Sequence, residues 1–162
     1  MTTGRNNRGV TLVELLTVVA ILGVLLVVLG FTFQGWIAKY KVEDDTKRFH
    51  ADLSEARARA MQKKRMTFVA LAVNQYQIFE DTNTPPDGNG QLDAGSDIRI
   101  TDATTSYDIT PTPTFSFDRE GLASFTGTIR LQSTMSPDYD CITISMTRIR
   151  IGRFTGGICQ EK

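Results

Sequence analysis

The stretch from Val10 to Phe33 reads VTLVELLTVVAILGVLLVVLGFTF, and it decides how the rest of the chain can be organised. Glu14 is its one charged residue, and Leu, Val, Ile and Phe dominate from Leu15 onwards. A helix rises about 1.5 Å per residue, so about 20 such residues match the hydrocarbon core of a bilayer, which is about 30 Å thick. We therefore predict a transmembrane helix over residues 10–33, with a separate domain behind it.

The short segment before this helix gives its orientation. Arg5 and Arg8 lie there, and basic residues flanking a membrane helix favour the cytoplasmic side, so the C-terminal part is predicted to be exported. A secretory signal peptide is an alternative, but its apolar core is about 7–15 residues and ends in a small-residue cleavage site, which this run lacks. A plain single-pass anchor, with Glu14 reaching the membrane interface, stays open.

The residues around Glu14 carry a resemblance to a known family. A polar leader with two arginines ends at Gly9, and Glu14 is the fifth residue of the apolar helix that follows. This pattern resembles the class III leader of type IV pilins and pseudopilins. The resemblance implies that residues 1–9 are removed by a prepilin peptidase after Gly9 and that Val10 is N-methylated. The family most often has Phe at this first mature position, so Val10 is a conservative departure.

The position of Glu14 then has a physical interpretation. A lone carboxylate in an apolar helix costs a few kcal/mol in lipid unless it finds a partner. Cleavage would create an ammonium group at Val10, and Glu14 could pair with that group on a neighbouring subunit. We expect Glu14 to set the register of assembly in a filament.

Overall composition and motifs give no support to several classes of function. Among the 162 residues, 18 basic side chains balance 18 acidic ones, which gives no general argument for nucleic acid or an anionic membrane as partner. The single histidine, His50, and the lack of a Gly-x-Ser-x-Gly or phosphate-binding motif argue against an enzyme. We predict that the protein is not an enzyme, and the resemblance to pilins implies a structural subunit.

The helix is predicted to continue beyond the apolar run, over residues 34–65. Apolar residues recur there mostly at steps of three and four, as on one face of an amphipathic helix: Val42, Phe49, Leu53, Ala56 and Ala60. The basic run at residues 63–65 suits the C-terminal end of a helix.

Residues 66–162 read as a β-rich domain. Strands are predicted at 66–73, 76–80, 98–101, 115–117, 128–131, 141–146 and 149–154. Residues 81–97 read as a loop, and residues 102–114 as an extended or edge segment. The fold class is therefore α+β, with a long N-terminal helix packed on a C-terminal antiparallel β-sheet or sandwich.

A second resemblance covers this domain. Phe115-x-Phe117-x-x-x-Gly121 precedes one strand, and Cys141-Ile-Thr-Ile-Ser-x-x-Arg148-Ile-Arg150 lies near the end. With the helix-to-strand junction, these residues resemble the minor pilin and pseudopilin group that includes general secretion protein H and fimbrial protein T. That group usually has Gly where this chain has Thr147.

The resemblance implies a minor pilin or pseudopilin of a type IV pilus or a type II secretion pseudopilus. It would be held in the inner membrane, with its N-terminus cytoplasmic and its C-terminal domain periplasmic. Its implied partners are other pilins through the N-terminal helix, the prepilin peptidase and the inner-membrane assembly platform. A membrane-anchored monomeric binding protein is an alternative.

The two cysteines, Cys141 and Cys159, both lie in the part predicted to be exported, where an oxidising compartment favours a disulfide. Closing a loop of about 18 residues would contribute about 3 kcal/mol on the chain-entropy estimate. Two free thiols are the alternative.

The loop at 81–97 is rich in oxygen ligands. Calcium takes about six to eight oxygens on a flexible loop, so a structural Ca²⁺ site is a candidate here. A plain loop is the alternative, because Asp, Asn and Gly are also the ordinary residues of turns. The candidate ligands are Asp81, Asn83, Asp87, Asn89 and Asp93.

The last third of the chain is locally basic. Arg148 and Arg150 would share one face of a strand, with Arg153 nearby, and such a row could contact phosphates. Some pilins of the resembled group take part in DNA uptake, so a DNA-binding minor pilin is an alternative function. Salt bridges to neighbouring subunits would explain the same residues.

Overall fold

The computed structural model describes residues 10–83 and 88–162, and for residues 28–34 it describes the backbone alone. The chain divides into two compact units, residues 1–37 and residues 38–162. The helix α1 (Leu12–Lys63) begins in the first unit and ends in the second.

The first unit contains the start of α1. Thr11 precedes the helix, and its Oγ1 accepts a hydrogen bond from the backbone N–H of Glu14 at 3.3 Å, as the N-cap residue of a helix does. The side chain of Val10, just before Thr11, is 70% exposed, and the described side chains of this unit's helix are exposed as well, for example Leu26 to 70%. Within the described part of the chain, no helix combines the length and the apolar character needed to cross a membrane. Residues 28–33 of the predicted span lie outside the described side chains.

The second unit is built on the C-terminal part of α1. Its predicted apolar stripe is confirmed, since all five residues are at most 2% exposed: Val42, Phe49, Leu53, Ala56 and Ala60. The helix ends at Lys63, two residues before the predicted end. Lys64 has a φ of 55°, the left-handed conformation that commonly stops a helix.

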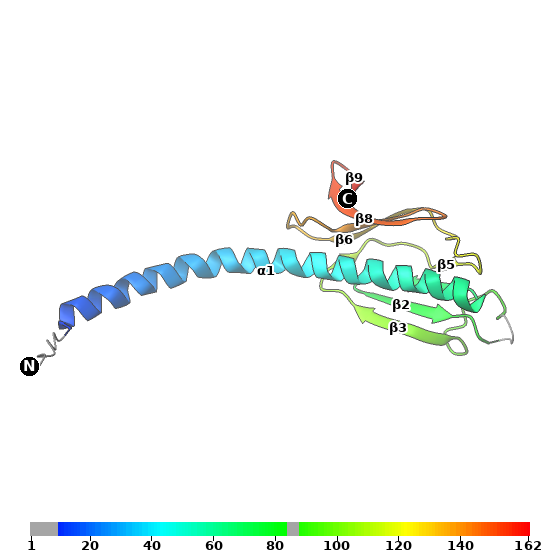
Figure 1. The fold of residues 1–162 in the computed structure, drawn as a ribbon, viewed down its shortest axis with the longest axis horizontal. Helices are drawn as coiled ribbons and strands as arrows, with labels where there is room; N and C mark the ends of the chain where they lie inside the picture. Colours follow the sequence, from blue (N-terminus) through cyan, green and yellow to red (C-terminus); the bar gives the residue numbers. More distant parts are fainter. Residues whose placement is uncertain (1–9, 84–87) are drawn as a thin grey trace, which may run out of the picture. The chain divides into compact units, whose positions relative to one another are not determined.

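Strands of the second unit form two antiparallel sheets (Figure 1). One has the order β3-β2-β1-β5, with β1 (Thr67–Leu71), β2 (Gln75–Glu80), β3 (Ile98–Thr104) and β5 (Phe115–Phe117). The other has the order β4-β6-β7-β8-β9, with β4 (Asp108–Ile109), β6 (Gly127–Gln132), β7 (Cys141–Ile144), β8 (Ile149–Thr155) and β9 (Ile158–Glu161).

Both sheets contribute to one core with the helix. Fully buried residues come from each sheet, for example Ile78 from the first and Ile142 from the second, and both belong to the same cluster as Phe49 of α1. In Figure 1 the C-terminal part of α1 runs along β2 on one side and β6 on the other. The α+β prediction, a long helix packed on antiparallel β-structure, is confirmed.

The motif around Gly121 has a packing explanation. Phe115 and Phe117 are both buried, with ring centroids 5.8 Å apart. Gly121 has a φ of 78°, and a β-carbon there would come within 2.7 Å of the Met61 sulfur on α1. The loop therefore needs a residue without a side chain at this point.

The sheets differ from the predicted strands at their edges. β3 continues to Thr104, and β4 occupies two residues of the segment 102–114. β9 lies beyond the last predicted strand, and it pairs with β8 from Gly152↔Glu161 to Thr155↔Ile158. Their sequence signals are weak because β4 has only two residues and β9 is exposed except at Cys159, so neither shows a long alternation of apolar and polar residues.

Candidate functional site

The predicted processing and assembly residues lie at the start of the chain. Gly9 lies outside the described residues, whereas Val10 is described and exposed. Glu14 is exposed in the first turn of α1. Thr11 and Glu14 have the spacing of a capping box, in which Glu at the third helical position supports the N-cap. This local role was not predicted, although the Thr-x-x-Glu pattern at residues 11–14 indicates it.

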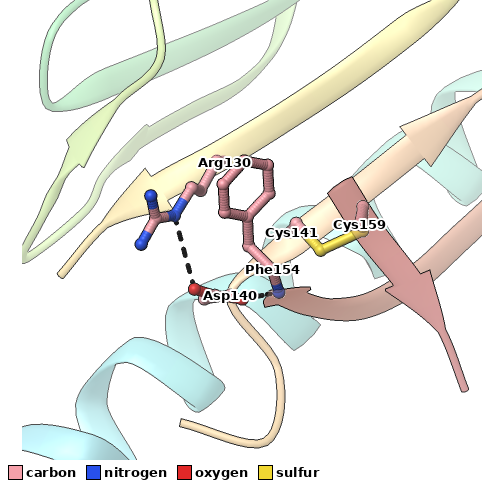
Figure 2. The surroundings of a disulfide bond; sticks show 5 residues. All are labelled: Arg130, Asp140, Cys141, Phe154 and Cys159. Carbon is pink, nitrogen blue, oxygen red and sulfur yellow. Dashed lines mark hydrogen bonds and ion pairs between the residues drawn. A yellow bond between two sulfur atoms is a disulfide. The ribbon is translucent and has the colours of Figure 1, made fainter. Parts of the chain in front are cut away.

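The cysteines meet on the second sheet. Cys141 of β7 and Cys159 of β9 form a disulfide, although β8 lies between these two strands. The pairings Cys141↔Gly152 and Phe154↔Cys159 show how the bond crosses β8. Figure 2 shows it beside the ring of Phe154. The disulfide therefore ties the edge strand β9 to β7, in addition to the hydrogen bonds between β8 and β9.

A second group of side chains next to the disulfide was not anticipated. Asp140, just before β7, is almost fully buried, and its Oδ1 accepts a hydrogen bond from the Phe154 N–H at 2.6 Å. Its Oδ2 lies 3.4 Å from Arg130 Nε, and the Arg130 guanidinium lies 4.4 Å from the centre of the Phe154 ring (Figure 2). Arg130 is thus positioned by an ion pair and a cation–π contact.

The residues proposed for DNA contact are less available than the sequence suggested. Arg148 is exposed in the turn before β8. Arg150 pairs with Glu161 across the β8–β9 ladder, and Arg153 lies 3.9 Å from Asp138. Glu161 therefore offsets the positive charge of Arg150, whereas the carboxylate of Asp138 beside Arg153 is shared with other cations.

Asp138 forms ion pairs with several basic side chains. Its carboxylate lies 3.4 Å from Lys162 Nζ and 3.4 Å from Lys39 Nζ. The hydrogen bond and charge of Lys162, and then the charge of Lys39, hold the pKa of Asp138 below its usual range. This group joins the C-terminus and the start of the second unit's helix to the segment before β7.

The loop at residues 81–97, where we considered a calcium site, contains hydrogen bonds from its own amide groups to its carboxylates. Asp81 is fully buried, and its two carboxylate oxygens accept hydrogen bonds from the backbone N–H groups of Asn89 at 3.0 Å and Gly90 at 2.7 Å. The main chain therefore gives each oxygen of this buried carboxylate a hydrogen-bond partner and ties the loop to Asp81.

The remaining candidate ligands show a similar pattern. Asp93 Oδ2 accepts hydrogen bonds from the side-chain amides of Asn83 and Asn89. Asp87 lies outside the described residues. Within residues 10–83 and 88–162, no group of three or more His, Cys, Asp or Glu side chains is placed to hold a metal ion.

Two protein-family models match this chain. Residues 4–32 match the prokaryotic N-terminal methylation motif, and residues 45–148 match type II transport protein GspH. Comparisons with curated proteins and with solved structures gave no match. Both matching families are structural subunits of the pilin type and not enzyme families. Because the GspH match spans more than half of the 162 residues, the chain belongs to the GspH family of type II transport proteins, the pseudopilins of type IV pilin-like architecture.

Proposed function

We propose that this protein is a minor pilin or pseudopilin that is cleaved between Gly9 and Val10, methylated at Val10 and assembled into, or primes, a pilus or pseudopilus. The single observation that carries the proposal is the methylation-motif match over residues 4–32, which includes the proposed cleavage site, the exposed Val10 and the first turn of α1. The GspH match over residues 45–148 supports it independently, because it lies in a different part of the chain.

The proposed location follows from the same segment. Residues 10–33 anchor the protein in the inner membrane and later form the filament core, while the amphipathic helix at 34–65 and the β-rich residues 66–162 lie on the periplasmic side. The partners are the prepilin peptidase, other pilins and the inner-membrane assembly platform. The disulfide between Cys141 and Cys159 is compatible with an oxidising compartment.

Glu14 is the residue proposed to set the register in the filament. In the isolated chain its backbone N–H already bonds Thr11 Oγ1, so its position serves the helix start as well. The two roles make different demands. A capping box accepts either Glu or Gln at this position, whereas an ion pair with a neighbouring ammonium group needs the negative charge.

This difference defines one test. Glu14→Gln keeps the capping pattern and removes the charge, and Glu14→Ala removes both. If Glu14 pairs with an ammonium group, both variants lose incorporation into filaments and co-purification with other pilins. Normal incorporation of Glu14→Gln would overturn the register role and leave only the cap.

The processing step has its own measurement, the intact mass of the protein purified from membranes of its native host. A mass that begins at Val10 and includes one added methyl group is the expected result. Gly9→Leu places a bulky side chain at the scissile bond and is expected to retain residues 1–9. An unprocessed N-terminus in the unmodified protein would overturn the proposal in favour of a plain anchor.

A further inference from the structure

The outer face of the second sheet carries an open cavity of about 590 Å³. Its lining residues come from β4, from β6, from the segments that follow these two strands, and from β8, which contributes Phe154. Most of its wall is hydroxyl or amide side chain: Thr110, Thr128, Gln132, Ser133 and Thr134. Arg130 and Asp108 are the charged lining residues. No part of the proposed pilin function uses this cavity.

Arg130 is prearranged in this cavity. Its Nε lies toward Asp140, which is 3% exposed, and its guanidinium rests over Phe154. In Figure 2 the two terminal nitrogens of Arg130 point away from Asp140. A guanidinium held in this way can donate hydrogen bonds to a ligand with little loss of side-chain entropy.

The charges in the cavity favour a neutral ligand. The positive charge of Arg130 is already balanced by Asp140, and Asp108 adds a second carboxylate. An added anion would meet an excess of negative charge, so the site suits a ligand that offers uncharged donors and acceptors. A polypeptide main chain is such a ligand.

The main chain of β6 supplies a direct reason to choose an extended peptide. The Leu131 N–H donates to the Asp140 carbonyl on the β7 side, and Arg130 is paired with Cys141. Because the main-chain groups of successive residues alternate between the two sides of a strand, those of Thr128 and Arg130 face the β4 side.

On that side the two residues differ. The Arg130 carbonyl accepts hydrogen bonds from Thr110 N at 2.8 Å and Thr110 Oγ1 at 3.0 Å. β4 pairs with β6 only through Asp108 and Ile109. Thr128 is in register with Thr143 of β7, but among the described residues no hydrogen bond reaches its main chain from the β4 side. The edge of β6 is therefore open where the cavity begins, and an incoming strand could add to it.

We propose that this cavity binds a short, uncharged, extended segment of another polypeptide, which pairs with the main chain of Thr128 and accepts hydrogen bonds from Arg130. The site goes beyond the proposed pilin role, because it lies in the second unit and involves neither Gly9, Val10 nor Glu14. Failure of processing at Val10 would therefore leave it standing, and its own failure would leave the pilin proposal standing.

The first experiment finds the occupant in the native host. The photo-crosslinking residue p-benzoylphenylalanine replaces Thr134, which is exposed at the cavity, and as a matched control replaces Met146, which is exposed outside it. We expect the Thr134 variant to crosslink to one defined peptide segment at about five times the control yield or more. A saccharide adduct, or a yield equal to that of the control, would overturn the proposal.

The second experiment tests strand addition with a synthetic copy of the crosslinked segment and the full chain in detergent micelles. Bound peptide should slow hydrogen exchange of the Thr128 amide about tenfold. Thr128→Pro, which removes that N–H, should weaken binding about tenfold, whereas Thr128→Val keeps the N–H and should bind nearly as well. Unchanged exchange at Thr128 in the unmodified protein with peptide bound would refute the pairing, even if the proline variant failed to fold.

Discussion

Gly152 of β8 lies in close contact with Cys159 of β9. A β-carbon at residue 152 would lie 3.1 Å from the Cys159 sulfur and 2.2 Å from the carbonyl oxygen of Gln160. The disulfide reaches from β7 to β9 across β8, and Gly152 is the β8 residue paired with Cys141. The missing side chain at residue 152 is what allows β9 to approach so closely.

Gly152→Ala is therefore expected to push β9 away from β8. The new methyl group meets backbone as well as sulfur, so the strand must shift, and we expect the free energy of unfolding to fall by about 1–3 kcal/mol. Urea denaturation measures this. Gly95→Ala is the matched control, since nothing lies within 4 Å of a β-carbon at Gly95. Equal stability of the two variants would contradict the close approach.

Removal of the disulfide should destabilise the domain through its unfolded state. The bond joins residues 18 apart in sequence, and replacement of both Cys141 and Cys159 by alanine should lower the free energy of unfolding by about 3 kcal/mol. The same loss should follow from a reductant in the unmodified protein. If the denaturation midpoint does not respond to reductant, the bond is not formed in solution.

The buried Tyr76 gives the domain a sensitivity to alkaline pH. Its hydroxyl donates to Asp52 Oδ2 at 2.5 Å, and burial, followed by that hydrogen bond, raises the pKa of Tyr76 well above its usual range. The folded state therefore holds the phenol proton more tightly than the unfolded chain. Stability from this group is complete below pH of about 10 and is lost as pH rises above that value.

Tyr76→Phe tests this directly. It should lower the free energy of unfolding at neutral pH by about 1–3 kcal/mol, because Asp52 loses its donor. It should also remove the part of the alkaline decline that belongs to Tyr76. Thermal denaturation between neutral pH and pH of about 11 measures both effects. An alkaline decline identical in both proteins would assign it to other groups.

Glu80 joins the end of α1 to β2. This carboxylate is 3% exposed and lies 2.8 Å from Lys63 Nζ and 3.2 Å from an Arg65 terminal nitrogen. Glu80→Gln should destabilise the domain by about 1–3 kcal/mol, since two cations lose a buried acceptor. A double-mutant cycle with Lys63→Met should give a coupling of about 0.5–1 kcal/mol, because half-exposed Lys63 is screened by water. Additive effects would mean that the two residues do not interact.

Much of the fold was predictable because its signals are local. The stripe from Val42 to Ala60 has helical spacing, and the alternation in β7 and β8 is a strand pattern, so both were predicted near their observed positions. The edge strands β4 and β9 were not predicted. β4 depends on a strand distant in sequence, because Asp108 pairs with Gln132. β9 pairs with the neighbouring β8, but it is also held by the disulfide to Cys141, 18 residues earlier.

The candidate sites divide in the same way. The pattern of Gly9 and Glu14 is contiguous, and it is the part of the chain that the methylation-motif match covers. The arrangement of Arg130, Asp140 and Phe154 comes from three separate segments, and sequence offers no spacing that joins them. The ion pairs of Arg150 with Glu161 and of Arg153 with Asp138 could not be predicted for the same reason, since these residues come together only in the folded domain.

The ion pairs of Glu80 also have a mechanical consequence. Lys63 and Arg65 lie on either side of the turn at Lys64, and both bind the same carboxylate. A pull along the axis of α1 would have to break both pairs before the end of the helix could slide by one turn, about 5.4 Å. A force applied along the helix would therefore be transmitted to β2 through Glu80. The end of α1 and the β-rich domain would then move together.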